Sequence, residues 1–436
     1  MSTAQHVVVI GGGAIGLMTA YQLATDGARV TLVDARRTGL GAAEVNAGWI
    51  CPAESAPVPG PGMIATSLKW MFRRDSPLYI RPSLDPQFVK FMLGMWRSCN
   101  APAQQAGFEA HLRLAESSGE AYDRYRSDGL DFELRHDGLL MAFTDPENLE
   151  HHRGLLELAR RFGRDPQVLV GDDVRVQEPK LSDRVHGGIY FPREEHLDPP
   201  ALMGALHRRL LELGVTILED APIDGVEHGW VAGGDGLRNI TAAGQQVGGD
   251  AYVLAAGPWT GPISRLLGVP LPIRPGKGYS VDVEPYDLRS SVNLSDAKVA
   301  VTPLARNLRL AGTMEFAGLD EELNQVRMGA ILRAPSAYFR DWVPPTGPVT
   351  PKAGIRPMTP DGIPVIGRLG SLANTYVSSG HGMQGITLGP GSALALSRMV
   401  LQGEVPDVLV PFAPQRFTRA LVRKTPTRSD IAADAA

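Results

Sequence analysis

The sequence predicts an α/β protein with two regions, and three observations support this. A buried strand, a glycine-rich turn and a helix open the chain, a second strand–turn–helix unit lies near its end, and a strand-rich stretch comes between them. Glycine and proline account for 49 and 35 of the 436 residues, which indicates many turns rather than a helical bundle. We therefore expect a doubly wound domain interrupted by a β-rich one.

The composition is that of a globular protein close to electrical neutrality. Hydrophobic residues make up 43% of the chain and charged residues 21%, which is enough apolar material for full cores. The net charge of −4 argues against a nucleic-acid coat, so no nucleic-acid partner is expected. Two cysteines, Cys51 and Cys99, are too few for a disulfide framework, which favours a reducing compartment.

An uncharged stretch over residues 7–24 is long enough to resemble a signal sequence or a membrane helix. Gly11, Gly12, Gly13 and Gly16 interrupt it, no Lys or Arg precedes it, and no small-residue cleavage site follows it. No other uncharged apolar run of about 18 residues occurs. We therefore expect a cytoplasmic protein without a membrane span.

The first strand–turn–helix unit is predicted over residues 6–34. Residues 6–10 are largely β-branched and apolar, as in a buried parallel strand. Helical periodicity follows up to Leu23, Gly27 ends the helix, and residues 29–33 form a second apolar strand. These elements make a βαβ unit.

The turn of this unit, at residues 11–16, has the pattern G-x-G-x-x-G. Its first glycine makes the tight turn, its second lets the backbone approach a pyrophosphate, and its third lets the helix pack on the strand. Asp34 ends the next strand, where an acidic side chain can accept hydrogen bonds from ribose hydroxyls. The pattern predicts a dinucleotide, and a position at the start of the chain suits FAD better than NAD. The predicted contacts are Gly11, Gly13, Ala14, Ile15, Gly16, Asp34, Ala35 and Arg36.

The middle of the chain is predicted to hold helices first and strands afterwards. Residues 52–66 are rich in Pro, Gly and Ala and are expected to form a loop, and residues 344–351 a linker. The expected helices lie within 67–99, 107–127, 147–163 and 199–213, and the expected strands at 215–218, at 251–255, in a hairpin around 229–236 and at several places in 270–345.

The second unit lies at residues 353–392. Prolines and a glycine surround Arg356, so we expect a rigid loop that presents one guanidinium. A strand at 375–378, a glycine-rich turn at 380–385 and a helix from about Pro390 are predicted to follow. Such a turn can donate N–H groups to the carbonyl edge of a flavin and bring the charge of a helix dipole near it.

The motif G-I-R-P-M-T-P-D-G-I-P-V-I-G, followed by S-G-H-G-M-Q-G, resembles the C-terminal signature of the D-amino-acid oxidase superfamily. The chain is most similar to the bacterial FAD-dependent D-amino-acid dehydrogenases of that superfamily. Residues 45–48, 67–72 and 277–280 agree with the family, and residues 254–259 are similar to its A-G-x-W turn. The resemblance extends from residue 6 to about residue 402.

This resemblance implies a Rossmann-like FAD-binding domain with an inserted β-rich substrate domain. The FAD-binding domain is expected to gather residues 1–85, 146–268 and 352–436, which leaves 86–145 and 269–351 for the substrate domain. FAD is expected to be non-covalent, because the Cys or His to which some relatives attach it has no counterpart in this sequence. Further contacts to FAD are implied for Asn46, Ala47, Gly48, Val226, Ala256, Gly257, Trp259, Gly382, Met383, Gln384, Gly385 and Ile386.

The resemblance also implies the reaction. A D-amino acid, or a cyclic imino acid such as a D-hydroxyproline, is expected to lose a hydride from Cα to flavin N5, with the electrons passed to a quinone or another electron-transfer partner. Arg356 is implied as the anchor of the substrate carboxylate, Tyr279 as an active-site wall or carboxylate donor, and His381 as a source of charge or dipole near the flavin. The alternatives are an oxidase that releases hydrogen peroxide, a nicotinamide-dependent dehydrogenase and a non-catalytic flavin-binding module.

Residues outside these motifs carry three further expectations. Arg309 is expected to face solvent rather than the flavin. The histidines and cysteines have no paired spacing typical of a metal site, so no metal is expected. Basic and aromatic residues alternate over 67–97, which predicts either peripheral contact with the inner face of the cell membrane or helices packed on the substrate domain.

Overall fold

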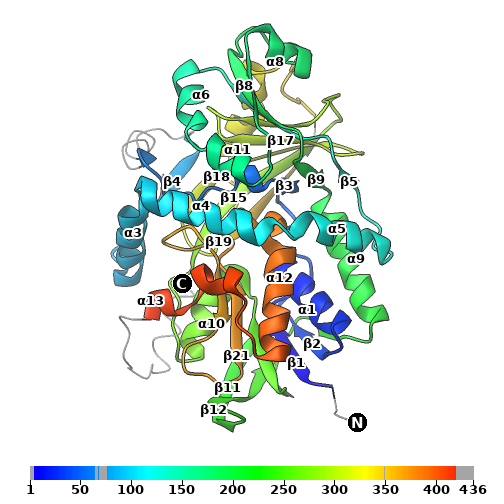
Figure 1. The fold of residues 1–436 in the computed structure, drawn as a ribbon, viewed down its shortest axis with the longest axis vertical. Helices are drawn as coiled ribbons and strands as arrows, with labels where there is room; N and C mark the ends of the chain where they lie inside the picture. Colours follow the sequence, from blue (N-terminus) through cyan, green and yellow to red (C-terminus); the bar gives the residue numbers. More distant parts are fainter. Residues whose placement is uncertain (1–3, 64–66, 68–75, 348, 419–436) are drawn as a thin grey trace.

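The computed structural model of the protein describes residues 4–63, 67, 76–347 and 349–418. A six-stranded sheet in the order β10-β2-β1-β14-β21-β20 forms the lower part of the molecule in Figure 1. Its neighbouring strands are parallel, except that β20 is antiparallel to β21. The strands are β1 (His6–Ile10), β2 (Arg29–Val33), β10 (Thr216–Leu218), β14 (Ala251–Leu254), β20 (Val365–Arg368) and β21 (Thr375–Ser379).

Both faces of this sheet are covered, which explains why its central strands are continuously apolar. Successive residues of a strand point to opposite faces, so Val7 and Val9 enter one core while Val8 and Ile10 enter another. The first core lies under α1 (Ala14–Thr25), α9 (Pro199–Glu212) and α12 (Gly385–Gln402). The second lies under α10 (Thr260–Leu266) and the small sheet of β11 (Ile223–Val231), β12 (Gly234–Ala242) and β13 (Gln245–Gly248).

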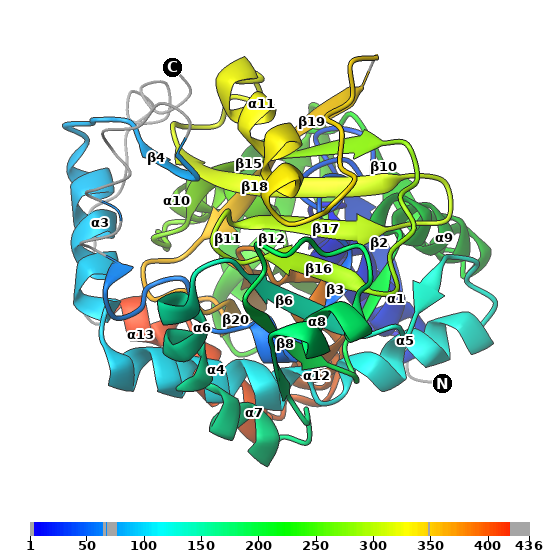
Figure 2. The same ribbon diagram turned by 90° about the horizontal axis from the view of Figure 1, so that it is seen from above.

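A second, nine-stranded sheet has the order β19-β15-β18-β17-β16-β6-β8-β7, with β4 also paired to β18. Helix α11 (Gln325–Arg333) lies against one side of this sheet, as Figure 2 shows. Its strands are β4 (Leu78–Ile80), β6 (Leu139–Phe143), β7 (Gln167–Val170), β8 (Gly187–Phe191), β15 (Arg274–Val283), β16 (Ser291–Leu294), β17 (Val299–Pro303), β18 (Leu308–Phe316) and β19 (Thr350–Met358). A third sheet joins β3 (Trp49–Ile50), β9 (Glu195–Leu197) and β5 (Leu134–Arg135).

Several remaining helices begin after a side chain that accepts hydrogen bonds from N–H groups of the first turn, with a proline at the first or second helical position. Asp85, Asn100 and Asp145 cap α3 (Pro86–Ser98), α4 (Ala101–Ala115) and α6 (Pro146–Arg153) in this way. The other helices are α5 (Ser118–Ser127), α7 (Leu156–Arg161), α8 (Asp172–Gln177) and α13 (Gln415–Thr418), with short 3₁₀ segments at Pro52–Glu54, Gly257–Trp259, Ala334–Ala337 and Asp407–Phe412.

The predicted elements of the first βαβ unit, the helix at 199–213 and the hairpin around 229–236 are confirmed. Other boundaries differ. The helices predicted over 107–127 and 147–163 are each two helices, the strand-rich stretch 270–345 includes α11, and the linker expected at 344–351 already enters β19 at Thr350. The predictions for 64–66, 68–75 and the last 18 residues fall outside the described part of the chain.

Helix α12 begins at Gly385, five residues before the start predicted at Pro390, so the proline lies inside it. A proline has no N–H for the carbonyl oxygen four residues earlier, here that of Ile386. The hydroxyl of Tyr122 in α5 donates to this oxygen at 2.7 Å instead. A side chain distant in sequence therefore allows the helix to extend through Pro390.

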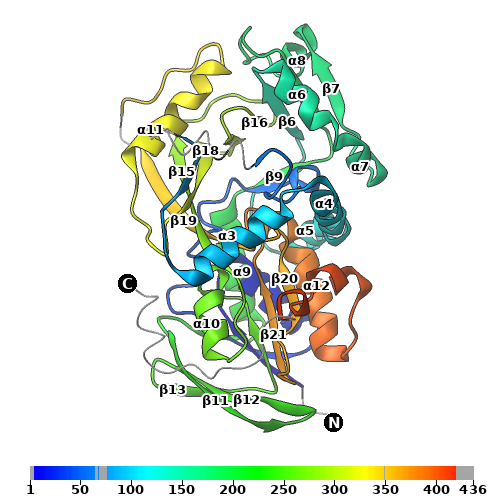
Figure 3. The same ribbon diagram turned by 90° about the vertical axis from the view of Figure 1, so that its left-hand side faces the viewer.

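The two large sheets divide the chain differently from the predicted domain boundaries. Strands β7 and β8, which we placed in the FAD-binding domain, belong to the nine-stranded sheet. Helices α4 and α5, which we placed in the substrate domain, pack against α12; Figures 1 and 3 show this arrangement. Within the described residues, no helix is both long and apolar enough to cross a bilayer.

Candidate active site

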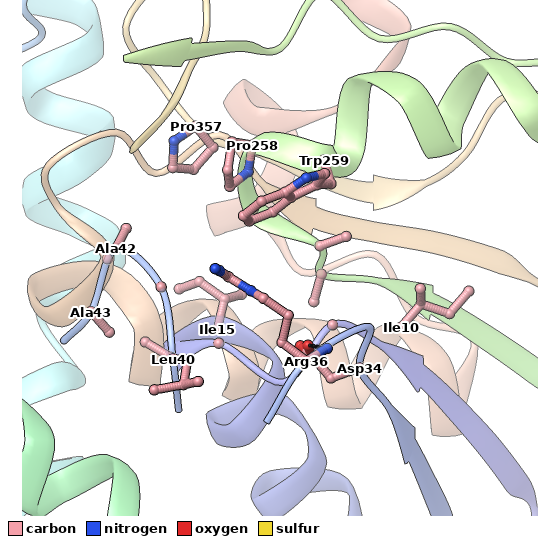
Figure 4. Close-up of a pocket in the computed structure, with 18 of the residues that line it drawn as sticks. Ile10, Ile15, Asp34, Arg36, Leu40, Ala42, Ala43, Pro258, Trp259 and Pro357 are labelled. Carbon is pink, nitrogen blue, oxygen red and sulfur yellow. Dashed lines mark hydrogen bonds between the residues drawn. The ribbon is translucent and has the colours of Figure 1, made fainter. Parts of the chain in front are cut away.

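A pocket lies at the carboxyl ends of β1, β2 and β14, where α1 and α12 begin. Parallel α/β sheets place their ligands at this edge. In Figure 4, Arg36 extends across the pocket towards Trp259, and Ile15, Leu40 and Ala42 lie around it. The predicted residues that line the pocket are Gly11, Gly13, Ala14, Ile15, Asp34, Ala35, Arg36, Asn46, Ala256, Gly257, Trp259, Arg356, His381, Gly382, Gly385 and Ile386.

The three glycines that define the G-x-G-x-x-G motif have three different local requirements. Gly11 has φ +108°, and a Cβ there would lie 2.5 Å from the carbonyl oxygen of Ala255. A Cβ on Gly16 would lie 1.7 Å from the oxygen of Gly11, so helix and strand could not pack. A Cβ on Gly13, by contrast, would meet nothing within 4 Å. The main chain therefore leaves open space at the helix N-terminus, where a pyrophosphate can accept N–H groups.

Asp34 is held in place by main-chain N–H groups. Its two carboxylate oxygens accept from Gly12 N at 2.5 Å and from Arg36 N at 2.7 Å. Burial raises the pKa of this carboxyl above its usual value, while the two hydrogen bonds oppose that shift. The guanidinium of Arg36 lies 4.8 Å from the centre of the Trp259 ring and 3.1 Å from a carboxylate oxygen of Glu321. These contacts fix the rim of the pocket where β2 ends.

The loop at residues 44–48 lies between the pocket and the nine-stranded sheet. Asn46 lines the pocket. Its side-chain oxygen accepts a hydrogen bond from Gly48 N at 2.7 Å, and its side-chain nitrogen donates to Met383 O at 3.4 Å. The expectation that Arg309 faces solvent is wrong. Its guanidinium is 2% exposed, pairs with both oxygens of Asp282 at 2.7 and 2.9 Å, and donates to Asn46 O at 3.1 Å. The arginine thus ties this loop to β18.

Arg356 lies in β19 rather than in the rigid loop that we predicted, and it pairs opposite Gly276 of β15. Its guanidinium faces the pocket and donates to the carbonyl oxygen of Thr313 at 2.7 Å. Within the described residues it has no ion pair with an Asp or Glu. Burial lowers the pKa of this guanidinium to about 10, so it stays charged at neutral pH. The planar guanidinium of such an arginine can bind a carboxylate through two parallel hydrogen bonds.

His381 is 3% exposed and lines the pocket. Its Nε2 lies 2.9 Å from the Ser392 hydroxyl, which itself donates to Leu388 O at 2.8 Å. The hydrogen-bond pattern therefore assigns the proton to Nε2, and Nδ1 is left as a buried acceptor with no partner in the described structure. Burial lowers the pKa of this imidazole to about 3. The expectation that His381 supplies a charge is therefore wrong, although a neutral dipole remains.

Tyr279 does not line the pocket. It is fully buried on the other face of β15, where its hydroxyl donates to Glu315 Oε1 at 2.8 Å. Burial and this hydrogen bond raise the pKa of the phenol. The predicted roles as wall or carboxylate donor do not fit this position. Predicted cofactor contacts that also lie outside the lining are Gly16, Ala47, Gly48, Val226, Met383 and Gln384.

Sequence reasoning missed most of the apolar lining. Small and aliphatic residues at the rim and floor carry no polar signal, and those inside a predicted strand or motif, such as Ala255, Pro258 and Pro357, were not named as contacts. The pocket residues that were not predicted are Ile10, Val33, Leu40, Gly41, Ala42, Ala43, Ala221, Ile223, Ala255, Pro258, Ile263 and Pro357.

Comparisons with known proteins agree with this architecture. The family of FAD-dependent oxidoreductases called DAO matches residues 6–399. A D-amino acid dehydrogenase of Bradyrhizobium diazoefficiens is 32% identical over 415 residues, 92% of this chain and 96% of that protein. Glycine oxidase from Geobacillus kaustophilus superposes with a TM-score of 0.71 at 22% identity, over 95% of this chain and 99% of that one. L-proline dehydrogenase from P. horikoshii gives a TM-score of 0.71 at 19% identity, covering 97% and 100%.

The pocket also fits the cofactor of that family. Two helices begin at it without a side-chain cap, at Gly13 and Gln384, and a Cβ on Gly13 or on Gly385 would meet only open space. The free N–H groups of both first turns can therefore donate to the phosphates and to the ring of FAD. The family match and this fit agree with the resemblance found in the sequence: the chain belongs to the DAO family of FAD-dependent oxidoreductases.

Proposed function

We propose that this protein is a D-amino-acid dehydrogenase, which oxidises the carbon that bears the amine and passes the electrons to an acceptor other than oxygen. The observation that carries the proposal is Arg356, a pocket-facing guanidinium without an acid partner in the described structure. Leaving a partly buried cation unpaired costs free energy. A ligand that brings its own carboxylate removes that cost, and amino acids do so.

Arg356 would orient the substrate. Its planar fork can hold both carboxylate oxygens, which fixes Cα relative to the pocket. When bound, FAD supplies the two-electron acceptor for the hydride that leaves Cα, and the imino acid that results hydrolyses to a 2-oxo acid and ammonia. His381 is neutral and offers an acceptor at Nδ1, so it adds no positive charge that would repel a substrate amine. The apolar lining at Ile15 and Trp259 excludes water around the cofactor.

The relatives bear on the substrate class and on the electron acceptor. The name of the dehydrogenase relative favours D-amino acids, and the likeness to L-proline dehydrogenase keeps a cyclic imino acid such as a D-hydroxyproline as a substrate class. The likeness to glycine oxidase favours the alternative, an oxidase that releases hydrogen peroxide. We propose a quinone as the acceptor. We also propose that FAD is bound non-covalently, because no cysteine lines the pocket among the described residues.

A lipid-soluble acceptor would place the protein at a membrane surface, and α3 has a suitable face. Val89, Leu93 and Trp96 are 53%, 42% and 59% exposed at helical spacing, with Lys90 and Arg97 exposed beside them. Apolar and basic side chains together bind anionic lipid surfaces. Trp96→Glu is expected to reduce co-sedimentation with vesicles of anionic lipid. Trp230→Glu, at the exposed hairpin of β11 and β12, is the matched control.

Anaerobic bleaching of the purified yellow protein tests the proposed function. Addition of D-amino acids and proline derivatives is expected to bleach the absorbance near 450 nm, whereas amines without a carboxylate leave it unchanged. Reoxidation by a soluble quinone should then be much faster than by air. Stoichiometric peroxide in air would favour the oxidase instead, and a flavin that no amino acid bleaches would refute both.

A further inference from the structure

Strand β18 carries an irregularity directly beside Arg356. On β15 and β18, Tyr279 pairs with Gly312, and two residues further along β15 Lys277 pairs with Glu315. Two steps on β15 therefore face three steps on β18, so one extra residue is accommodated at Thr313–Met314. Such a bulge changes the direction in which the following side chains point, and bulges are frequent next to active sites.

The faces of β15 show what the bulge does. A Cβ on Gly278 would lie 2.2 Å from the guanidinium of Arg356, and a Cβ on Gly276 would lie 2.7 Å from the sulfur of Met314. These glycines therefore face the same side as Arg356 and Met314. Tyr279 points to the opposite side, where its hydroxyl meets Glu315.

A regular β18 would reverse this assignment. Side chains alternate along a strand, and a shift of one residue moves each of them to the other face. If the same sequence continued from Gly312 in regular register, without a bulge, Glu315 would lie on the Arg356 face. Glu315 is instead 4% exposed on the far face, with its Oε1 2.9 Å from Nε of Arg327. The bulge thus gives the glutamate its own cation and keeps it away from Arg356.

Thr313 supplies a neutral contact where an acid would otherwise stand. Its φ is +64°, a left-handed conformation that a β-branched residue rarely adopts. In this conformation its carbonyl oxygen accepts from Nη1 of Arg356 at 2.7 Å. Strained residues of this kind persist where the surrounding structure holds them, often at functional sites. The contact steadies the guanidinium without neutralising it.

We propose that the bulge at Thr313–Met314 determines the specificity of the site for carboxylates. It directs Glu315 to Arg327, so that Arg356 remains free for the carboxylate of the substrate. This inference rests on the proposed function. It adds that the charge of Arg356 is kept available by the register of β18, and not only by the presence of the arginine.

A pair of substitutions at Met314 tests the proposal in the holoenzyme. The sulfur of Met314 lies 4.0 Å from Nη1, so Met314→Glu puts a carboxylate on the Arg356 face without altering the bulge. Met314→Gln has nearly the same shape and no charge. We expect KM for the amino acid to be at least 100-fold higher in the Glu variant than in the Gln variant. Binding of benzoate, a carboxylate that cannot be oxidised at an α-carbon, should weaken similarly in calorimetry.

Equal KM values and equal benzoate affinities in the two Met314 variants would overturn the proposal.

Arg356→Lys distinguishes a failure of the proposed function from a failure of the inference about the bulge. If that substitution leaves KM and flavin reduction unchanged, the proposed function fails and the bulge loses its role with it. If Arg356→Lys impairs the enzyme while the two Met314 variants behave alike, only the inference about the bulge fails.

Discussion

The cofactor end of the pocket, at residues 11–16, is built differently from the substrate end around Arg356. At the cofactor end the main chain makes the site, and the glycines matter because they have no side chain. At the substrate end a single guanidinium makes it, and Thr313 and Gly278 from neighbouring strands decide where it lies. The geometry of the cofactor end is determined by one short segment of sequence, whereas the geometry of the substrate end depends on how strands distant in the sequence pair.

Glycine substitutions at the cofactor end give the largest expected effects and separate folding from binding. Gly16→Val is expected to prevent folding, because its Cβ would overlap the oxygen of Gly11. Gly13→Val should fold, because its Cβ enters open space, but it should lose FAD. The ratio of absorbance at 450 and 280 nm and far-UV circular dichroism measure the two outcomes. A fully loaded yellow Gly13→Val protein would contradict the assignment of the cradle.

Arg356→Lys tests the substrate end. Lysine keeps the charge but loses the planar fork, so kcat/KM for the amino acid should fall tenfold to a hundredfold, about 1.4–2.8 kcal/mol. The loss should appear in the rate of flavin reduction, measured by rapid mixing, while FAD content stays normal. Arg368→Lys, at an exposed position in β20, is the control. Reduction at the wild-type rate would remove Arg356 from the site.

Asp34→Ala returns to the cofactor end with a smaller expected effect. It removes the acceptor for two main-chain N–H groups and the predicted partner of the ribose, so FAD should bind more weakly by about 1–3 kcal/mol. Asp34→Asn retains one acceptor oxygen and should lose less. Titration of the apoprotein with FAD measures both variants. Unchanged affinity in the Ala variant would show that Asp34 is not a cofactor ligand.

The smallest predicted effect concerns Glu194, a buried acid that lies at neither end of the pocket. Burial raises the pKa of Glu194 to about 8. Between pH 4.5 and 8 the folded state therefore binds more protons at this group than the unfolded state, and this group's contribution to stability falls as pH rises. Glu194→Gln should reduce the drop in Tm between pH 5 and pH 9. Glu404→Gln, at an exposed position, should keep the wild-type drop; an identical drop in Glu194→Gln would refute the pKa assignment.

The difference between the two ends also explains what the sequence could predict. The glycine turn and Asp34 were found because their spacing along one short segment carries the signal. Arg309 was misjudged because its partner Asp282 lies on a neighbouring strand, and a lone arginine in a strand resembles a solvent-facing one. Tyr279 was placed at the site because residues 277–280 agree with the family, but alternation along β15 turns its side chain away. The bulge that reverses Glu315 is a property of pairing, which no local pattern displays.

The strand order of the six-stranded sheet has a consequence for folding. Strand β1 pairs with β14, Val7 opposite Ala251, and β14 pairs in turn with β21, Tyr252 opposite Thr375. The glycine turn is synthesised first, yet the helix entrance opposite it forms only from residues near 385. Contacts so distant in sequence close slowly. A nascent chain can therefore complete its FAD site only when synthesis is nearly finished, and cofactor capture would mark the end of folding.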